Sequence, residues 1–541
     1  MTAVRTYGVA LVALACLSAG SAAQGKKGAA DTKPECSMNY DDPSELKDAS
    51  NFLNKAQYYQ QTGQQPDQQK KPLQSAVEKL TLRADHYAKN KDSHAFLLGQ
   101  ALVMWSKIPG TGDNPKRGSI GFLGDKDQPI NIPKTVDSLF SVVEKDVPSC
   151  ADQTDGYRQQ LWGPMINDVQ RLFNANKLDS ASAALTRASA AYPSSPYNAY
   201  FAGQIAYKQD SDAAASAAFE KAAKLGAAMV ATGDTSVAGI TEYSTFMAPY
   251  TGQRAATVMN AGPDQTGALK RSIAGYQTYL KNYSCPQFAE NAQSGMFDAM
   301  RMVNDTAGLR TELTNMAAQT KPCSGLTWYN GARDAKDIGQ SALAVQLADK
   351  AVAFSPYSAA LGNAAAVYYD AKDWAKLLPV SRRLTEIAPN MPDNYQLLAL
   401  AYNGLGMEKG ATPAQKKAYT DSATTTYLAS EALDVNVRVN EFSSDGNKRK
   451  LGGSIVLVDH TPGQRPAAKA AKGKPAPAPS AVPSQKPKPR QVTIKIDFLD
   501  KDGKPVATQS ADVAANADSP TNFSVVADNA AIVGYRYAKI Q

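Results

Sequence analysis

The sequence is poor in the residues that most catalytic and metal sites use. Only three histidines occur among 541 residues, His86, His94 and His460, and none stands in an HExxH motif. No two cysteines have CxxC spacing, so the sequence indicates no zinc site. No nucleophile–base set and no carboxylate pair stands out from the charged background. We therefore predict no enzyme, no catalytic or metal-binding residue and no cofactor.

Long apolar runs are also missing, so no transmembrane segment is predicted. The longest candidate, Val9–Leu17, is too short to span a bilayer. With Arg5 before it and Ser21-Ala22-Ala23 after it, it is typical of a signal peptide over residues 1–23, leaving Gln24 as the mature N-terminus. A lipid anchor on Cys16 is the alternative. In either case we predict that the protein is exported. It would then be periplasmic, associated with the outer membrane, or secreted.

Positive charge is confined to one segment. The formal net charge is +8, and residues 461–490 hold seven basic residues and no acidic one. Arg5 leaves with the signal peptide, so the rest of the chain is neutral, which argues against a basic nucleic-acid-binding face. The segment is rich in Pro, Ala and Lys and reads as a solubilising loop. The alternative is a weak, salt-dependent contact with an anionic surface such as membrane headgroups or acidic envelope polymers.

Cysteine is scarce, and its even count in the mature chain suggests disulfides. Removal of the signal peptide leaves Cys36, Cys150, Cys285 and Cys323, which allow three pairings. Pairing nearest neighbours in sequence gives Cys36–Cys150 and Cys285–Cys323. The first bond would close a loop of about a hundred residues, worth about 4–5 kcal/mol in the chain-entropy model.

A repeat of 34 residues is clearest in residues 353–408. Three positions recur in two successive units: Leu361, Ala365 and Tyr368 in the first, and Tyr395, Ala399 and Tyr402 in the second. One period earlier Gly331 matches Ala365, and Pro389 closes a unit. A large residue, a small one four later and an aromatic three after that share one helical face. The small residue lets a second helix approach, and the proline ends that second helix.

This pattern resembles the tetratricopeptide repeat (TPR), a helix-turn-helix unit of the same period. Gly203 and Phe219 stand at similar repeat spacings. The resemblance implies an α-solenoid that recognises partners, without naming a ligand. The fold class we predict is mainly α: a TPR-like α-solenoid followed by a small all-β sandwich.

The predicted domains follow from shifts in composition and period. Residues 24–43 are a disordered leader, residues 44–433 are the helical repeats, and residues 434–541 form the β domain with the basic segment as a loop. Two irregular insertions interrupt the repeats. Residues 108–133 are Gly- and Pro-rich and read as a long surface loop that is a candidate contact region. Residues 226–267 are a helix-containing insertion, whose apolar cluster is Tyr243, Phe246, Met247 and Tyr250.

In the β domain the hydrophobic period changes from helical to two, as in Val435, Val437 and Val439. Six or so short strands are predicted in all, enough for a small sandwich. The stretch from Phe498 to Val506 resembles the small bacterial FxLYD-type β-sandwich. Within it Asp500-x-Asp502-Gly503 reads as a hairpin turn; a calcium loop is the alternative, but its closing Glu is missing.

Tyrosines are the remaining candidates for a partner site. Tyr197, Tyr200 and Tyr395 lie on first helices of predicted repeats, where the concave surface of a TPR solenoid would expose them to an extended ligand. The alternative is that they pack between helices, as we expect for Tyr207, Tyr368 and Tyr402. We thus predict a non-enzymatic protein-interaction scaffold of the bacterial cell envelope. The alternative is a sugar- or peptide-capturing subunit of an outer-membrane uptake system.

Overall fold

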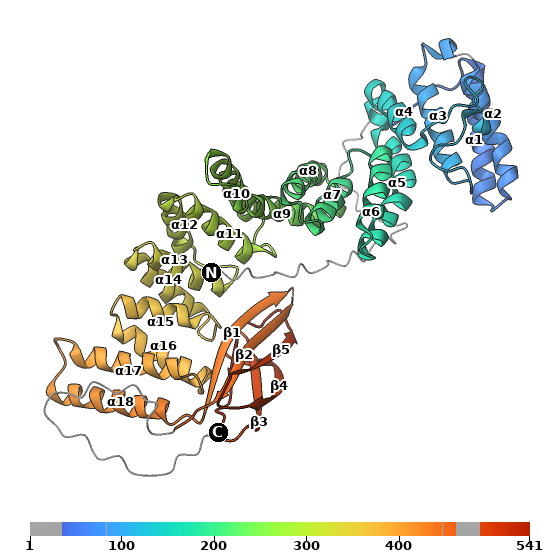
Figure 1. The fold of residues 1–541 in the computed structure, drawn as a ribbon. Coiled ribbons are helices and arrows are strands. Elements are labelled where there is room, and N and C mark those ends of the chain that lie inside the picture. Colours follow the sequence, from blue (N-terminus) through green and yellow to red (C-terminus); the bar gives the residue numbers. More distant parts are fainter. Residues whose placement is uncertain (1–34, 83, 446, 461–486) are drawn as a thin grey trace. The chain divides into compact units, whose positions relative to one another are not determined.

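Antiparallel helical hairpins occupy most of the chain and are followed by two small sheets (Figure 1). A computed structural model describes residues 35–82, 84–445, 447–460 and 487–541. The predicted signal peptide, residues 24–34 of the leader and residues 461–486 of the basic segment lie outside these ranges. Within them, no helix combines the length and the apolar character that a membrane crossing requires. Two compact units divide the chain, an N-terminal unit within Gly20–Phe288 and a C-terminal unit, Ala289–Gln541.

The described part of the N-terminal unit consists of helices that pack mainly against their neighbours in sequence. Its α-helices are α1 Ser44–Gln61, α2 Pro66–Thr81, α3 Lys91–Ser106, α4 Ile132–Asp146, α5 Ala151–Asn174, α6 Leu178–Ala191, α7 Pro196–Lys208, α8 Asp212–Ala231, α9 Ala238–Thr257 and α10 Pro263–Asn282. Short 3-10 turns join some of them: η1 Ala84–Tyr87, η2 Arg117–Ile120, η3 Pro148–Cys150 and η4 Thr235–Val237. Close approach depends on glycine: a Cβ on Gly99 of α3 would lie 2.5 Å from the Phe140 ring of α4.

Helix α3 is buried on almost every side, unlike a helix at the surface of an open repeat array. The residues Phe96, Leu97, Leu98, Leu102 and Trp105 are all at most 6% exposed. A helix that is apolar all round is stable only inside a core. Helices α1, α2, α4 and α5 surround α3, so this end of the chain is a packed bundle.

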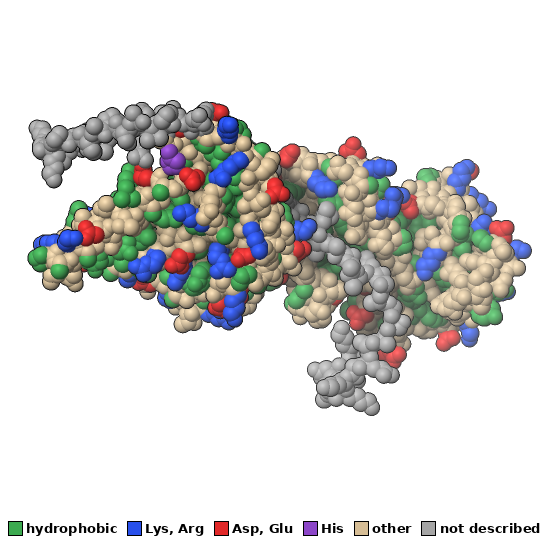
Figure 2. Space-filling view, turned by 90° about the horizontal axis from the view of Figure 1, so that it is seen from below, with side chains coloured by type: hydrophobic (Ala, Val, Ile, Leu, Met, Phe, Trp, Pro, Cys, Tyr) green, Lys and Arg blue, Asp and Glu red, His purple; other side chains and the backbone are tan. Residues whose placement is uncertain are grey.

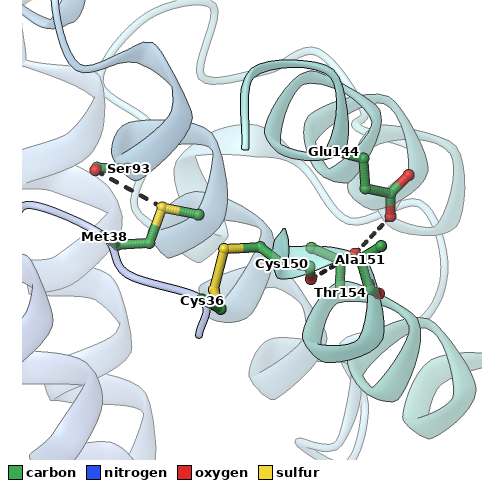
Figure 3. Close-up of a disulfide and its surroundings, with 7 residues drawn as sticks. All are labelled: Cys36, Met38, Ser93, Glu144, Cys150, Ala151 and Thr154. Atoms are coloured by element: carbon green, nitrogen blue, oxygen red, sulfur yellow. Dashed lines mark hydrogen bonds between the residues drawn. A yellow bond between two sulfur atoms is a disulfide. The ribbon is translucent and has the colours of Figure 1, made fainter. Parts of the chain in front are cut away.

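A disulfide ties the start of the described chain to the junction between α4 and α5 (Figure 3). Cys36 is bonded to Cys150, and Met38, two residues on, receives a weak hydrogen bond of 3.9 Å from Ser93 of α3. Beside the bond, the Thr154 hydroxyl lies 3.3 Å from the Cys150 carbonyl oxygen and also contacts Glu144. Cys285 and Cys323 are disulfide-bonded as well.

Residues 108–133, predicted as an irregular loop, fold back on themselves between α3 and α4. An isolated bridge joins Lys116 to Pro129, and the Ile130 amide donates to the Pro115 carbonyl over 2.9 Å. Gly121 adopts a φ of 101° and lies so close to the Gln74 backbone of α2 that a Cβ would be 2.7 Å from its carbonyl oxygen. Only glycine meets both demands, and it seats the loop on α2.

Residues 226–267, predicted as an irregular, helix-containing insertion, form the end of α8, the whole of α9 and the start of α10, and α9 packs against both neighbours. Helix α8 continues to Ala231, α9 occupies Ala238–Thr257, and α10 begins at Pro263. Gly226, Gly233 and Gly239, together with Pro249 inside α9, hide the helical period from sequence inspection. The interior proline is tolerated because Gly275 of α10 leaves room for its ring.

The C-terminal unit continues the hairpins and ends in the sheets. Its described helices are α11 Ala289–Met302, α12 Thr306–Ala318, α13 Gly325–Asp337, α14 Ser341–Phe354, α15 Leu361–Asp370, α16 Trp374–Ile387, α17 Pro392–Met407 and α18 Pro413–Glu431. The 34-residue period sets this arrangement: Leu361, Ala365 and Tyr368 are all at most 2% exposed. Ala399 is 7% exposed, whereas Pro389 and Tyr402 are half-buried. The fold is therefore TPR-like, with alternating first and second helices.

The β region forms two three-stranded antiparallel sheets, in the orders β1-β2-β5 and β4-β3-β6. The strands are β1 Val435–Asp445, β2 Lys448–Leu457, β3 Arg490–Leu499, β4 Pro505–Ala515, β5 Thr521–Asp528 and β6 Gly534–Tyr537. Alternation sets the register: on β3, Val492, Ile494, Ile496 and Phe498 are at most 5% exposed while the residues between them are not buried. This is the small β-sandwich that the change of period predicts.

Candidate functional site

The face between α7 and α9 brings together the tyrosines singled out in the N-terminal unit. Tyr197, Tyr200, Gln204 and Tyr207 follow one another at intervals of three and four residues, so they form one stripe along α7. The three tyrosines are partly exposed, whereas Gln204 is only 7% exposed. The stripe therefore has an accessible rim and a buried polar centre.

The direction of the stripe follows from how α7 packs. Gly203 faces α8, where a Cβ on it would lie 2.8 Å from the Phe219 ring. With that side of α7 against α8, Tyr200 is directed toward α9, and its ring centroid is 5.8 Å from that of Tyr243. Phe219 is 6.0 Å from Tyr243 in an edge-on arrangement, so three aromatic rings from three helices meet here.

Polar groups are buried at the centre of these rings. The Gln204 amide lies near the hydroxyls of Tyr200 and Tyr243; burial raises the pKa of both tyrosines, and the amide partly offsets this. Tyr243 is 7% exposed, and its hydroxyl makes no hydrogen bond of normal geometry among the described residues. A buried hydroxyl of this kind is costly unless a ligand or water completes it. The centre therefore places one amide and two hydroxyls among aromatic rings.

A charged cluster closes the stripe at the C-terminal end of α7. Arg254 of α9 donates to the Tyr207 hydroxyl over 3.0 Å and to the Asp212 carboxylate over 3.2 Å. Its guanidinium also lies 5.0 Å from the centre of the Tyr207 ring. Burial, with the nearby Tyr250, raises the pKa of Tyr207 to about 12, so this hydroxyl remains a neutral donor at physiological pH.

Tyr197 forms the opposite rim. Its ring is 5.8 Å from that of Trp162 in α5, and its hydroxyl donates a long hydrogen bond of 3.5 Å to the Ser236 carbonyl. The indole of Trp162 is itself fixed by a 2.9 Å bond to Asn198. Burial raises the pKa of Tyr197 as well. The ring is thus held in place on one side and open on the other.

Tyr395, the third predicted contact residue, does not belong to this face. It lies in the C-terminal unit at the start of α17, where it is half-buried and its hydroxyl donates to the Pro389 carbonyl over 2.9 Å. Tyr537 of β6 lies near it: burial is the main cause that raises the pKa of Tyr537, and Tyr395 adds a smaller contribution. The Tyr395 hydroxyl is therefore already bonded within the protein and lies near its β domain.

Sequence reasoning missed three members of the α7–α9 face: Gln204, Tyr243 and Arg254. Gln204 carries a signal, because it falls four residues after Tyr200 and three before Tyr207. Tyr243 was recognised only as part of an apolar cluster, because its helix was predicted as an insertion.

Two weaker sequence candidates have structural explanations. Asp500 accepts backbone hydrogen bonds from Asp502 and Lys504, each 2.9 Å long, as a hairpin turn requires. Among the described residues no group of three or more His, Cys, Asp or Glu is placed to hold a metal ion. In the loop of residues 108–133, the Gly118 amide donates to the Lys126 carbonyl, so it is committed to the loop's own backbone.

Charge does not gather into a single-sign patch on the face shown in Figure 2, where basic and acidic side chains are interspersed over the described residues. This agrees with a repeat region whose sequence is close to neutral outside the basic segment. Contacts on such a surface depend on shape, rings and hydrogen bonds more than on long-range attraction.

Comparisons with known proteins add little to this picture. No protein-family model matches the chain, and no curated protein matches it either. Among solved structures, the human IFIT1 dimer with m7Gppp-AAAA aligns at 10% identity over 72% of this chain and 96% of that one, with a TM-score of 0.28. A chain of the APC/C hetero-tetramer Cut9-Hcn1 aligns at 11% over 71% and 75%, with a TM-score of 0.23. The TPR domain of P58(IPK) aligns at 10% over 71% and 99%, with a TM-score of 0.20. Scores this low give no guide to what this chain binds.

Proposed function

We propose that this chain is a non-enzymatic interaction scaffold of the bacterial cell envelope, and that it binds a protein partner through the α7–α9 face. The observation that carries the proposal is the buried polar centre: the Gln204 amide and the Tyr243 hydroxyl lie together, both buried, within a ring of aromatic side chains that is partly exposed at its rim. Rigid tyrosines that border a polar centre are a common means of holding an extended peptide.

A photo-crosslinking experiment tests this assignment. A photoreactive amino acid in place of Tyr197, on the open rim, is expected to capture one specific envelope protein from cell extract. Tyr200→Ala in the same chain removes a wall of the polar centre and should abolish capture, whereas Tyr200→Phe should retain most of it. Tyr427→Ala removes a tyrosine that is 52% exposed in the other unit and is the control. Capture that survives Tyr200→Ala unchanged places the partner elsewhere.

The second candidate function is capture of a sugar or peptide for an uptake system. The observation that favours it is the same combination of rings, one amide and hydroxyls, which also suits a sugar ring. If oligosaccharides raise the melting temperature of the wild-type chain and not of Tyr200→Ala, while no envelope protein is captured, this alternative replaces the scaffold. Turnover of any substrate by the purified protein would contradict both.

The basic segment supports a second, weaker contact within the same proposal. Residues 461–490 would hold the scaffold near an anionic surface through lysine and arginine side chains. Binding to vesicles with anionic headgroups should then fall steeply between 50 and about 200 mM salt, and should vanish when the basic residues are replaced by glutamine. Binding that is insensitive to salt would leave the segment a solubilising loop.

A further inference from the structure

Two turns between successive repeats of the C-terminal unit carry the contacts that join helices to sheets. One is residues 355–360, between α14 and α15, and the other is residues 388–391, between α16 and α17. Tyr357 in the first and Asn390 in the second each stand three residues after the end of the preceding helix, Phe354 of α14 and Ile387 of α16, so they occupy equivalent places in the two turns. The β domain therefore contacts the same part of two successive repeats.

Tyr357 sits in a socket made by two glycines of the β domain. A Cβ on Gly503, in the β3–β4 turn, would lie 2.5 Å from a carbon of the Tyr357 ring, and Gly534 of β6 lies directly against the Tyr357 carbonyl oxygen. Arg383 of α16 also lies over the ring, with its guanidinium 5.0 Å from the ring centre. Glycine is required at Gly534 because backbone approaches backbone there, and at Gly503 because the Tyr357 ring packs directly on it and its φ is 81°.

A backbone hydrogen bond beside this socket extends the contact. The Ala359 amide donates to the Val533 carbonyl over 3.0 Å, and the Val533 amide donates to the Leu499 carbonyl of β3 over 2.9 Å. The helical turn is thus continued into the hydrogen-bonding pattern of the sheet. Such a bond is directional, so it fixes orientation as well as distance.

Asn390 makes the second contact, and it is completely buried. Its side-chain amide donates to the carbonyls of Val435 in β1 and of Ile540, over 2.9 and 2.8 Å, and its side-chain oxygen accepts from the Ile540 amide over 2.7 Å. Its backbone carbonyl accepts from the Val437 amide over 2.8 Å. Asn390 therefore joins the first strand and the C-terminal segment to the α16–α17 turn.

We propose that the β domain is a clamp that holds these two turns at a fixed separation and so fixes the spacing and curvature of helices α13 to α17. Each helical repeat contacts only its neighbours, so the spacing and curvature of the array can vary when nothing else connects the repeats. A β domain bound to both turns, one through the β4-β3-β6 sheet and the other through β1 and the C-terminal segment, removes that freedom. This inference concerns the C-terminal unit alone and does not depend on the partner site proposed on α7 and α9.

Pulsed electron resonance between two spin labels tests the clamp. Encoded non-cysteine labels at Asp337 and Lys409, both exposed and close to the turns α13–α14 and α17–α18, leave the disulfides intact. The wild-type chain is expected to give one narrow distance peak. The double variant Tyr357→Ala with Asn390→Ala should lose it and give a broad distribution, whereas the control Tyr427→Ala should keep it. A narrow, unshifted peak in a double variant that retains its helical circular dichroism overturns the proposal.

If the double variant does not fold, hydrogen exchange of the wild-type chain tests the clamp instead. The amides of Ala359, Val437 and Ile540 should open together with those of α15 to α17, with one common free energy. Two separate opening free energies, one for the sheets and one for the helices, overturn the clamp. Asn390→Ala alone should accelerate exchange at Ile540 by roughly tenfold, as expected from the loss of one buried hydrogen bond.

Discussion

The buried guanidinium of Arg158 provides the sharpest test of how the N-terminal unit is held together. Arg158 lies on α5, is 4% exposed, and has three carboxylates around it. Its Nε donates to Asp137 over 3.0 Å, its Nη1 and Nη2 contact Glu144, and Asp155 lies 3.4 Å away. Burial alone lowers the pKa of Arg158, but Glu144 and Asp137 together raise it above its usual value. The side chain is therefore fully charged and links α4 to α5.

Arg158→Met keeps most of the side-chain volume and removes only the charge and its hydrogen bonds. The carboxylates of Asp137, Glu144 and Asp155 then lie close together without a cation. Removing one partner of a buried ion pair costs about 3–5 kcal/mol, because the remaining charges are left uncompensated. These three carboxylates are 27–41% exposed, so water offsets part of the cost and we expect a loss of about 2–4 kcal/mol at pH 7.

The loss should be measured as a change in opening free energy by hydrogen exchange of α4 and α5 in increasing urea, because a chain of two units does not unfold in one step. At pH 4 the penalty should shrink, since the unpaired carboxylates take up protons. Arg158→Met combined with Glu144→Gln should recover part of the loss at pH 7. A penalty below about 1 kcal/mol, or one that is equal at pH 4 and pH 7, would refute the ion-pair explanation.

Asp155→Asn is the companion to this test, because burial raises the pKa of Asp155 above its usual value and Arg158 only partly offsets the rise. A carboxyl whose pKa is higher in the folded state binds its proton more readily there. Its contribution to stability is therefore fully present below its unfolded pKa and is lost as pH rises through the folded pKa. Replacing Asp155 should remove this component of the pH profile and leave stability at pH 7 equal or slightly higher. A marked loss at pH 7 would show that the ionised carboxylate stabilises the fold.

The other predictions concern packing and covalent links. Gly404 of α17 is so close to the Trp374 ring that Gly404→Ala should cost about 1–3 kcal/mol through overpacking, whereas Gly362→Ala, with open space around it, should gain about 0.5–1 kcal/mol. Thermal unfolding of the C-terminal unit distinguishes the two, and equal effects would contradict the packing explanation. The Cys36–Cys150 bond spans a sequence separation of 114, so removing it should cost about 4–5 kcal/mol in opening the N-terminal unit. Peptide mapping without reductant should find these two cysteines in one linked fragment and no free thiol at Cys285 or Cys323.

Capping residues and hydrophobic periodicity were sufficient to predict the helices that pack against their neighbours in sequence. The Asp42-Pro43-Ser44 start and the stripe of Leu46, Leu53 and their neighbours predict a helix over Ser44–Gln61, and α1 has these bounds. In α17, however, the lag of 34 residues selects Ala399 as the small contact residue, while Gly404 is a position where a Cβ would collide with the Trp374 ring of α16. Periodicity identifies which residues share a face, but a side chain on the facing helix decides which of them must be small.

Contacts between residues far apart in sequence could not be predicted from the sequence. Asn390 and Ile540 are 150 residues apart, and nothing near Asn390 indicates that it joins a strand to the C-terminal segment. Tyr395 was chosen as a partner contact for the same reason. Its place in the repeat exposes it in an isolated solenoid, and its proximity to Tyr537 of β6 arises only when both regions are folded.

The turns between repeats are a suitable place to attach a second domain, and the reason is energetic. The residues that match the repeat pattern, such as Leu361 and Ala365, are already buried between helices, so they have no surface left for another contact. A turn residue such as Tyr357 or Asn390 bears little of that packing, so it can contact a second domain without giving up a helix–helix contact. Selection can therefore fit it to a glycine socket or a strand edge. The 34-residue period identifies the helices, while the residues that distinguish this chain from a plain repeat array lie between them.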